Sequence, residues 1–559
     1  MLSPSTPEIN KLIIYLKEKN FTILEKYALK FVKKFPNFAF GWKILGIALF
    51  QNDKISKSIA SYKKSLDLNS SDFETNFNLA LSLQAIGDLA NATNYYKITI
   101  KLNSNYIQSY INLGVIFKSL GNLNEAIKYF EKVIILNPNL IEGFFNLGII
   151  LQEKNLYNES IKYFERVLSI NPKLEQAYNS LGHSYQKINK IDESISAYKK
   201  AISINPNYAE AFNNLGIVYR DLGNLDESVN AYKKAISINP NYAEAFNNLS
   251  YTYLQQYKFD KSFKYLEWRW KAQKRIGNKF ESIKPLWNGE KEKKIFIWKE
   301  QGIGDEIMFC SIIPEILNIS KKIILCCDER LISIFKRSIS NNIKYITNFD
   351  QISENEFDYH IPMGSLQRLF RNKIEDYKIS AKGYLLDDKK RTSILEQNLK
   401  KNNNKLIGIS WHTNSFISMK SFRNISLEKL TLSLNFPKIN FINLQYGDFS
   451  KEIKLLNEYQ NINIYDDLEI DKKNNLDDLV SLMAACDLVI TIDNITAHLA
   501  GNLGISSMIL LPYNADPRWG QKNENSYLYN SVKLYRQLNL GNWDDVLKKL
   551  RKDVYDLLL

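Results

Sequence analysis

Acidic, basic and glycine residues follow strand-like runs at several places in the C-terminal half of the chain. The first is WKEQGIGDEIMFCSIIPEI, from Trp298 to Ile316. A strand ends at Trp298, Gly302 and Gly304 allow a tight turn, and Asp305 precedes a helix. Because ligands of open α/β sheets bind beyond the carboxyl ends of strands, Asp305 could act as a general base toward a hydroxyl group. The alternative is that Asp305 only caps the helix.

The second motif is DLVITIDNITAHLAGNLGISSMILLP, from Asp487 to Pro512. A buried strand runs into Asp493, and a helix is expected to begin near Thr496. The amino terminus of a helix carries free amide donors and partial positive charge, which suit a diphosphate. Thr496 could add a hydroxyl, and His498 could donate to a phosphate oxygen. Alternatively, Thr496 is a plain cap and His498 a core histidine.

The third motif is IGISWHTNSFISMKSFRNISL, from Ile407 to Leu427, in which a strand leads into a polar loop. Lys420 and Arg423 in this loop could neutralise negative charge that develops on a leaving group. Exposed loop cations are more often simply solvated, so both interpretations stay open. His412, directly after the strand, is a weaker candidate.

Two further loops follow expected strands. FINLQYGD ends a strand at a turn that contains Gln445 and Gly447. ADPRWG contains Asp516, Arg518 and Trp519, which could border a bound nucleotide or fill the domain interior.

Short β-branched runs separated by helical stretches predict a parallel α/β fold for this half of the chain. A break rich in lysine and asparagine near 389–405 predicts two α/β halves, each similar to a Rossmann domain. The expected strands are Ile295–Trp298, Ile323–Cys326, Ile343–Ile346, Leu406–Ser410, Phe441–Leu444, Leu488–Ile492 and Met508–Leu511.

The N-terminal half repeats with a period of 34 residues. Asn-Pro recurs at 137–138, 171–172, 205–206 and 239–240, and a leucine followed by a small residue keeps the same spacing from Leu45 to Leu249. Each unit predicts two amphipathic helices, in which a small residue lets the helices approach, an aromatic residue packs between neighbouring repeats, and proline ends the second helix. This spacing resembles the tetratricopeptide repeat (TPR), which implies an all-α solenoid that binds protein.

An asparagine precedes the repeat leucine in most units, with Ser180 as the exception. Amides at a fixed repeat position could form a ladder that bonds an extended polypeptide backbone. The arrangement is similar to the asparagine ladder of O-linked N-acetylglucosamine transferases. The alternative is that asparagine only caps or packs locally. The residues are Asn78, Asn112, Asn146, Asn214 and Asn248.

Composition narrows the possible classes of protein. The chain has 559 residues, a net charge of +14 and four cysteines. The charge excess lies mostly in the repeats and is carried by lysine, without arginine forks or an aromatic–basic platform, which argues against nucleic-acid binding. Cysteine and histidine spacing predicts neither a disulfide framework nor a metal site. No secretory signal or membrane span is expected, so the predicted compartment is the cytoplasm.

Five motifs of the C-terminal half together resemble one known family. They are EQGIGD, DLVITID, AHLAGNLG, Leu444-Gln445 with Gly447, and Arg518-Trp519. The chain resembles bacterial TPR glycosyltransferases, whose catalytic half is similar to the heptosyltransferase-like GT-B family. That resemblance implies that Asp305 is the catalytic base. It also implies that Asp493, Thr496 and His498 hold the donor diphosphate. The full set of residues expected to bind the donor adds Lys420, Arg423, Gln445 and Asn494. Departures include Asn494, where threonine or serine is usual, and SYLYN at 526–530.

The resulting prediction is a TPR superhelical solenoid followed by a GT-B fold. The expected parts are a helical cap at 1–38, about seven repeats at 39–276, and two α/β halves at 277–400 and 401–559. The predicted activity moves a sugar from a nucleotide-sugar to a hydroxyl of a protein or glycan recruited by the repeats, with no metal or other cofactor. The alternative is a TPR scaffold whose GT-B half is inactive.

Overall fold

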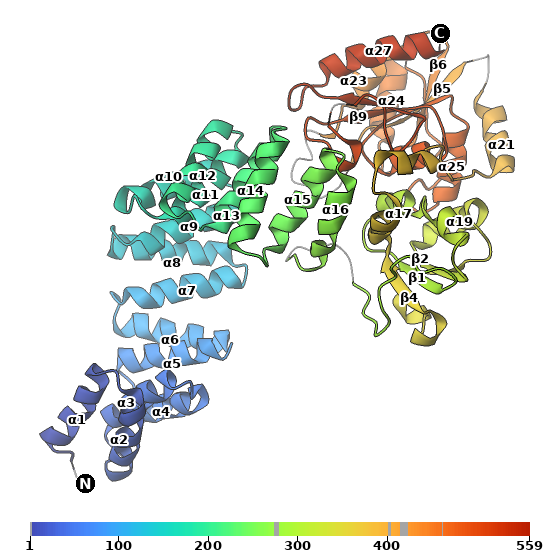
Figure 1. Ribbon diagram of the computed structural model, residues 1–559. Coiled ribbons are helices and arrows are strands. Elements are labelled where there is room, and N and C mark those ends of the chain that lie inside the picture. The colour runs from blue at the N-terminus through green and yellow to red at the C-terminus, as the bar shows by residue number, and fades with distance from the viewer. Residues whose placement is uncertain are drawn as a thin grey trace. The chain divides into compact units, whose positions relative to one another are not determined.

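The computed structural model describes residues 3–272, 279–400, 404–413, 423–460, 462–521 and 523–558. It divides into two compact units, Met1–Asn214 and Leu215–Leu559. The chain is helical up to Trp270, and two parallel sheets follow (Figure 1). Among these described residues, no helix has both the length and the apolar character needed to cross a bilayer.

The first unit is a series of helix hairpins (Figure 1). Its helices are α1 (Thr6–Lys17), α2 (Phe21–Lys34), α3 (Ala39–Gln51), α4 (Ile55–Leu68), α5 (Phe73–Ala85), α6 (Leu89–Leu102), α7 (Ile107–Ser119), α8 (Leu123–Leu136), α9 (Ile141–Glu153), α10 (Tyr157–Ile170), α11 (Glu175–Lys187), α12 (Ile191–Ile204) and the start of α13 (Ala209–Asp221).

Glycine–aromatic contacts hold the two helices of a repeat together. A methyl group added to the repeat glycine would lie less than 3.0 Å from the aromatic ring sixteen residues later. The helices can therefore approach this closely only because the glycine has no side chain. The aromatic residue packs on the small residue of its own repeat, whereas the spacing predicted a place between neighbouring repeats. The pairs are Gly46–Tyr62, Gly114–Phe130, Gly148–Phe164, Gly182–Tyr198 and, in the second unit, Gly216–Tyr232.

The Asn-Pro pairs end the second helix of their repeats, as predicted. α8 and α10 stop at Leu136 and Ile170, and the asparagine that follows each has extended backbone angles, with φ of −144° and −130°. Proline disfavours the helical conformation for the residue before it and lacks the amide that would continue the ladder.

The second unit begins with the last helices of the repeat half and continues into a four-stranded sheet with the order β3-β2-β1-β4. All its strand pairs are parallel. The helices before it are α14 (Leu225–Ile238), α15 (Ala243–Gln255), α16 (Phe259–Leu266) and the 3-10 helix η1 (Glu267–Trp270). The sheet and its α-helices are β1 (Lys294–Trp298), α17 (Ile303–Cys310), α18 (Ile313–Leu317), β2 (Lys322–Cys326), α19 (Ile332–Ser338), β3 (Lys344–Ile346), β4 (Tyr359–Pro362) and α20 (Gln367–Phe370).

The second sheet has six parallel strands in the order β10-β9-β8-β5-β6-β7. Its elements are α21 (Lys389–Leu399), β5 (Lys405–Ser410), α23 (Leu427–Ser433), β6 (Ile439–Asn443), α24 (Ser450–Tyr459), β7 (Ile464–Tyr465), α25 (Leu476–Ala484), β8 (Leu488–Ile492), α26 (Ile495–Asn502), β9 (Ser507–Leu511), β10 (Val532–Arg536) and α27 (Asp544–Leu558).

All seven expected strands are present within one or two residues of their predicted ends. The sequence reasoning missed three others, and each lacks a strong apolar run. β4 contains a histidine and a proline, β7 has two residues, and β10 alternates apolar residues with Lys533 and Arg536. All three lie at sheet edges, where a strand needs less burial.

Apolar contacts join the parts of the second unit. One cluster of buried side chains runs from Ile297 and Leu325 of the first sheet to Leu406 and Leu444 of the second. A separate cluster packs Phe259 of α16 against the second α/β half. The last helix of the repeat half is therefore part of the same packed body as the sheets.

From the packing of the repeats, we expect Phe164→Ala to lower the local stability of its repeat strongly. The ring of Phe164 is fully buried against Gly148, so its loss should destabilise α9 and α10 by about 3–5 kcal/mol. Amide hydrogen exchange of these two helices measures the effect. Ile135→Ala is the control, because this side chain is 69% exposed and its change should stay within about 0.5 kcal/mol. Equal exchange rates in both variants would contradict the packing.

Candidate functional site

An arginine in the second α/β half connects the loops of both sheets. Arg518 lies in the loop after β9, and its Nη1 donates to Oδ1 of Asp305, in the first turn of α17, at 2.6 Å. Its Nε donates to Oδ1 of Asp516 at 2.8 Å. Burial opposes the charge of Arg518, but the two carboxylates outweigh it and raise its pKa. The Gly302–Asp305 turn is thereby tied to the second sheet by a permanent cation.

Asp305 is not the helix cap that one interpretation expected. The N-cap of α17 is Gly302, and Asp305 is the third helical residue. Its carboxylate is therefore directed to Arg518 and not to the amides of its own helix. The interpretation as a plain cap is wrong.

Asp493, at the carboxyl end of β8, is buried and bonded on both oxygens. Trp519 Nε1 donates to its Oδ1 at 2.8 Å, and Arg423 Nη2 donates to its Oδ2 at 3.2 Å and to its carbonyl at 2.7 Å. Burial raises the pKa of Asp493. Its visible role is to hold Trp519 and Arg423 in place. Lys420, the other predicted cation, lies outside the described residues.

Asn494 is the N-cap of α26, so the alternative that Thr496 is a plain cap is wrong. Its Oδ1 accepts from the Thr496 amide at 2.9 Å, and its Nδ2 donates to Ser410 Oγ at 2.8 Å. Thr496 is buried in the first turn. Two first-turn amides, those of Thr496 and Ala497, are satisfied by Asn494 itself. With these amides bonded, the remaining positive character of this helix end comes from its dipole.

Gln445 follows β6 and links the ends of two strands, β6 and β5. Its Oε1 accepts from Ser410 Oγ, the Trp411 amide and the His412 amide at 2.9, 3.1 and 2.9 Å. The side chain is 1% exposed. These bonds use the acceptor capacity of the amide oxygen, so Gln445 positions the backbone after β5.

His498 lies inside the packed interior, in contact with the loop after β9 that contains Arg518 and Trp519, called here the bridging loop. Its ring stacks on Trp519 with centroids 5.3 Å apart and planes at 20°, and its Nδ1 lies 2.8 Å from Tyr529 Oη. Burial, followed by the positive charge of Arg518, lowers its pKa to about 3, while Asp516 acts in the opposite direction. The ring edge with Cδ2 faces Gly304. His498 thus combines core burial with a position beside the Asp305 turn.

A buried ion pair holds the start of the first motif, Trp298 to Ile316, in place. Arg269 of η1 donates to Glu300 through Nε at 2.7 Å and Nη2 at 3.1 Å, and to Ser365 Oγ at 2.9 Å. Glu300 also accepts from the Gly364 amide at 2.5 Å. The end of the repeat half therefore anchors the residue two positions before Gly302.

Glu306 is a second carboxyl group beside the turn. It accepts from the Asp328 amide at 2.8 Å, and burial raises its pKa to about 7. Glu306 was not among the predicted site residues, although a carboxylate next to Asp305 in an otherwise apolar helix could have indicated it. Tyr529 and Arg269 were also missed, because their partners are distant in sequence.

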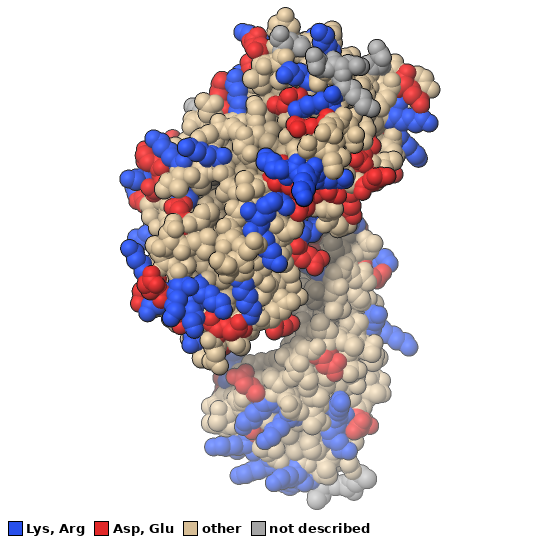
Figure 2. All heavy atoms as spheres, turned by 90° about the vertical axis from the view of Figure 1, so that its right-hand side faces the viewer, with Lys and Arg blue, Asp and Glu red and all other residues tan. Residues whose placement is uncertain are grey.

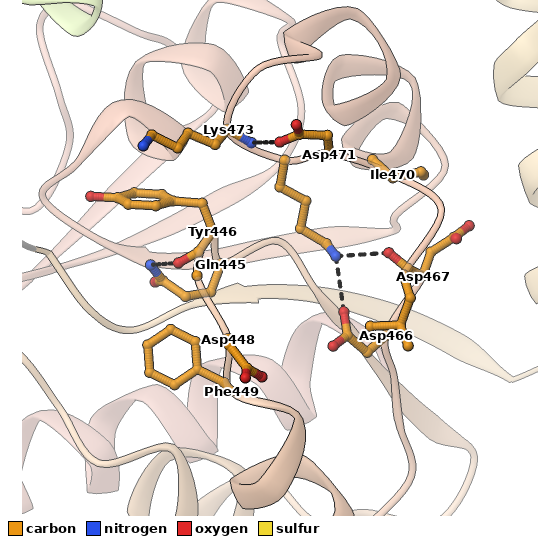
Figure 3. Close-up of a pocket in the computed structure, with 12 residues that line it drawn as sticks. Gln445, Tyr446, Asp448, Phe449, Asp466, Asp467, Ile470, Asp471 and Lys473 are labelled. Atoms are coloured by element: carbon orange, nitrogen blue, oxygen red, sulfur yellow. Dashed lines mark hydrogen bonds and ion pairs between the residues drawn. The ribbon is translucent and has the colours of Figure 1, made fainter.

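A cavity of about 330 Å³ opens beyond the carboxyl ends of β6 and β7. The rings of Tyr446 and Phe449 lie on one side, and Asp466 and Asp467 lie on the other (Figure 3). Lys472 spans the acidic side, donating to Asp466 Oδ1 and the Asp467 carbonyl, both at 2.9 Å. The wall thus offers aromatic faces and hydrogen-bond acceptors to one ligand.

Three of the five repeat asparagines donate hydrogen bonds inside the solenoid. Asn112 Nδ2 donates to Tyr96 Oη at 3.0 Å, Asn146 Nδ2 to the Glu142 carbonyl at 2.8 Å, and Asn214 Nδ2 to Asn179 Oδ1 at 3.0 Å. Each primary amide has a second N–H and a carbonyl, so these bonds leave capacity for a ligand. Asn78 lies half-buried in α5, and Asn248 lies in α15 of the second unit.

The charge distribution on the surface is mixed. On the face shown in Figure 2, lysine and arginine atoms are interspersed with aspartate and glutamate atoms. Nucleic-acid sites instead collect cations along one stripe. Within the described part of the chain, no group of three or more histidine, cysteine, aspartate or glutamate side chains could hold a metal ion.

Comparison with known proteins identifies the repeats. Residues 107–140 and 141–174 match two models of the tetratricopeptide repeat, and residues 187–220 and 216–256 match a third, a TPR repeat model. The solenoid is built from tetratricopeptide repeats. These repeats indicate a protein-interaction scaffold.

Similar proteins cover only part of the chain. Protein FlbA of Caulobacter vibrioides is 27% identical over 293 residues, and the chain spans 48% of its length. Among solved structures, MamA is 28% identical, covering 29% of this chain and 88% of its own, with a TM-score of 0.26. YrrB, a TPR protein with an unusual peptide-binding site, is 24% identical, covering 33% of this chain and 95% of its own, with a TM-score of 0.29.

The lowered pKa of His498 predicts a pH dependence of stability. An unfolded histidine titrates near 6.5, so below that pH the unfolded state binds a proton that the folded state does not. Stability from this residue is full above pH 6.5 and falls as the pH drops toward 3, by about 2 kcal/mol between pH 7 and pH 5.

The measurement compares the melting temperatures of the wild type and His498→Gln at pH 5, 6 and 7. Glu306 has a raised pKa and acts in the opposite direction, but it is present in both proteins and cancels in the difference. The wild type should lose more stability than the variant on acidification. If the difference in melting temperature between the wild type and the variant does not change with pH, His498 is not buried in its neutral form.

Breaking the Arg269–Glu300 ion pair should lower the free energy of unfolding more than breaking a surface ion pair does. Arg269→Met leaves a buried carboxylate unpaired and should cost about 3–5 kcal/mol in urea unfolding. Adding Glu300→Gln should recover part of the loss. Lys549→Met, which removes a salt bridge to the exposed Glu524, is the control and should cost about 0–1 kcal/mol. Similar losses from both single variants would refute a buried anchor.

Proposed function

We propose that the two α/β halves of the second unit form a GT-B glycosyltransferase that uses a nucleotide-sugar donor. The observation that carries the proposal is the ion pair between Asp305, after a strand of the first sheet, and Arg518, after a strand of the second. A carboxylate and a cation from the ends of two parallel sheets meet there. Ligands of such sheets bind beyond the carboxyl ends of the strands.

The proposed reaction needs a base and an environment that stabilises a departing diphosphate. Asp305 would take the proton of an acceptor hydroxyl through Oδ2, since Oδ1 is bonded to Arg518. The hydroxyl oxygen would form a bond to the anomeric carbon of the sugar while the bond from that carbon to the diphosphate breaks. The nucleoside diphosphate would leave with both bonding electrons.

Positive groups around α26 would stabilise that leaving group. Arg423 and Arg518 approach this helix end through the Asp493 carboxylate and the bridging loop. The helix dipole adds partial positive charge at its amino terminus. Such cations and dipoles act on charge that develops in the transition state. On this proposal no metal ion is required, and Lys420 would contribute a further cation.

The cavity beside β6 and β7 suits the nucleoside part of the donor. A base could lie against Tyr446, and carboxylates such as Asp466 could accept hydrogen bonds from ribose hydroxyls. Two strand spacings, from β8 across β5 to β6, separate the α26 terminus from this cavity by about 10 Å. A nucleoside in the cavity would thus direct its diphosphate toward α26.

The repeats would recruit the acceptor, as a polypeptide or a protein that carries the acceptor glycan. The remaining capacity of the asparagine amides in the solenoid supports recognition of an extended backbone.

A second candidate function is a TPR scaffold whose α/β half is inactive. It is favoured by the saturation of Gln445 and Asp493, which are bonded to the protein itself. This candidate expects partner binding that survives substitution of Asp305, Asp493 and His498 together.

Titration with nucleoside diphosphates separates the two candidates. Melting temperatures of the full chain are measured with UDP, GDP, ADP and CDP, and donor hydrolysis is measured with the matching nucleotide-sugars. One nucleotide at one hundred times its Kd should stabilise the protein by about 2.7 kcal/mol. If none of the four shifts the melting temperature, the glycosyltransferase proposal fails.

Asp305→Asn tests the assignment of the base. Hydrolysis or transfer should fall by at least about 100-fold, because the amide cannot accept the proton, while the nucleotide-induced shift in melting temperature remains. Asp350→Asn, at an exposed position of the same α/β half, should keep full activity. Unchanged turnover in Asp305→Asn would exclude this residue as the base.

A further inference from the structure

A chain of three buried polar side chains lies behind the helix end that faces the Asp305 turn. His498 Nδ1 lies 2.8 Å from Tyr529 Oη, and Asn502 Nδ2 lies 3.3 Å from the same oxygen. All three residues are buried, with His498 4% and Tyr529 2% exposed. The direction of the hydrogen bonds in this chain decides which nitrogen of His498 bears a proton.

The orientation of the Asn502 amide is set by a backbone carbonyl. Its Nδ2 also donates to the His498 carbonyl at 3.0 Å. A carbonyl oxygen can only accept, so the nitrogen and not the oxygen of the amide must occupy this place. The same nitrogen therefore donates to Tyr529 Oη.

With Asn502 donating to it, the Tyr529 oxygen has its own proton to give, and His498 Nδ1 lies at hydrogen-bond distance to accept it. A neutral imidazole carries one proton, so a ring that accepts at Nδ1 carries it at Nε2. Burial keeps the ring neutral, with a pKa near 3. The tautomer follows from the two bonds and does not require a charge on the ring.

The opposite edge of the ring faces the first motif. A methyl group added to Gly304 would lie 3.1 Å from His498 Cδ2 and 3.9 Å from Nε2. Trp519 covers one face of the ring, and Arg518 and Asp516 are the charged groups that act on it. The Nε2 edge is thus directed toward the turn that carries Asp305.

We propose that Tyr529 is a positioning residue that holds His498 in the Nε2–H tautomer, so that Nε2 donates a hydrogen bond to the diphosphate of the donor. This inference rests on the proposed function. Tyr529 does not touch the donor and acts only through His498. A neutral donor of this kind orients a phosphate oxygen without changing its charge during a pH change between 5 and 8.

The ring of Tyr529 and its hydroxyl can be tested separately. Gly501 packs directly on the ring, where an added methyl group would come within 3.0 Å. Tyr529→Phe keeps this contact and removes only the hydroxyl. Tyr527→Phe is the matched control, because Tyr527 is a tyrosine two residues away whose buried hydroxyl makes no hydrogen bond among the described residues.

The first measurement is nitrogen NMR of the full chain labelled with 15N-histidine. The chain has four histidines, and His498→Gln assigns the signals of His498. The wild type and Tyr527→Phe should show a protonated Nε2 and an unprotonated Nδ1. Tyr529→Phe should show a mixture of tautomers. A protonated Nδ1 in the wild type, or an unchanged tautomer in Tyr529→Phe, overturns the assignment without any nucleotide.

The second measurement is the Kd of the nucleoside diphosphate that stabilises the wild type. Tyr529→Phe should weaken binding by the fraction of His498 that leaves the Nε2–H tautomer, about twofold for an equal mixture, and Tyr527→Phe should bind as the wild type does. A changed tautomer with an unchanged Kd overturns the contact with the diphosphate. A wild type that binds none of the four nucleotides overturns the proposed function, while the NMR result still decides whether Tyr529 sets the tautomer.

Discussion

The arrangement of the candidate site depends on one cation, Arg518, held between Asp305 and Asp516. A guanidinium group keeps its charge at every physiological pH, so in a partly buried place it must have carboxylate partners. Here one partner belongs to the loop after β9 and the other to the turn after β1. The pair therefore determines how the first motif meets the second sheet. Trp519, the next residue, then reaches Asp493 and His498.

The polar residues at the strand ends mostly satisfy one another. Gln445 joins the backbone after β5 to β6, Asn494 joins α26 to Ser410, and Asp493 holds Trp519. A buried polar group without a partner is costly, so such a network holds one geometry. Few groups then remain for a ligand, chiefly Asp305, the edge of His498 and the side chains of the cavity. Under the proposed function, such a network would preorganise the site for its donor.

The two parts of the chain are stabilised in different ways. In the repeats, each glycine–aromatic contact, such as Gly148 with Phe164, involves residues sixteen positions apart, and stability is a sum of neighbouring interactions. In the second unit, the core joins residues more than a hundred positions apart, such as Ile297 and Leu444. The buried Arg269–Glu300 pair and Phe259 belong to both kinds of structure, because the last helices of the repeat half pack on the α/β halves.

Local spacing was enough to predict the repeats, their helix ends at Asn-Pro, and seven strands. The reason is that amphipathic helices and buried strands are specified by neighbours within a few residues. The strands β4, β7 and β10 were not predicted, because they lie at sheet edges and edge strands need few apolar residues. The sequence also placed Asp305, Asp493 and His498 at the ends of strands, where parallel topology brings side chains together.

What those side chains bond to was decided only by the tertiary structure. Whether Asp305 caps its helix or pairs with Arg518, 213 positions away, depends on how the two sheets pack. Likewise, the partner of His498 is Tyr529, whose hydroxyl has no local pattern in the sequence. Residue types and periodicity by themselves determined the TPR solenoid, the α/β halves and the position of the candidate residues along the chain. The hydrogen-bond partners were decided by packing, because contacts between residues far apart in the chain produce no periodic pattern in the sequence.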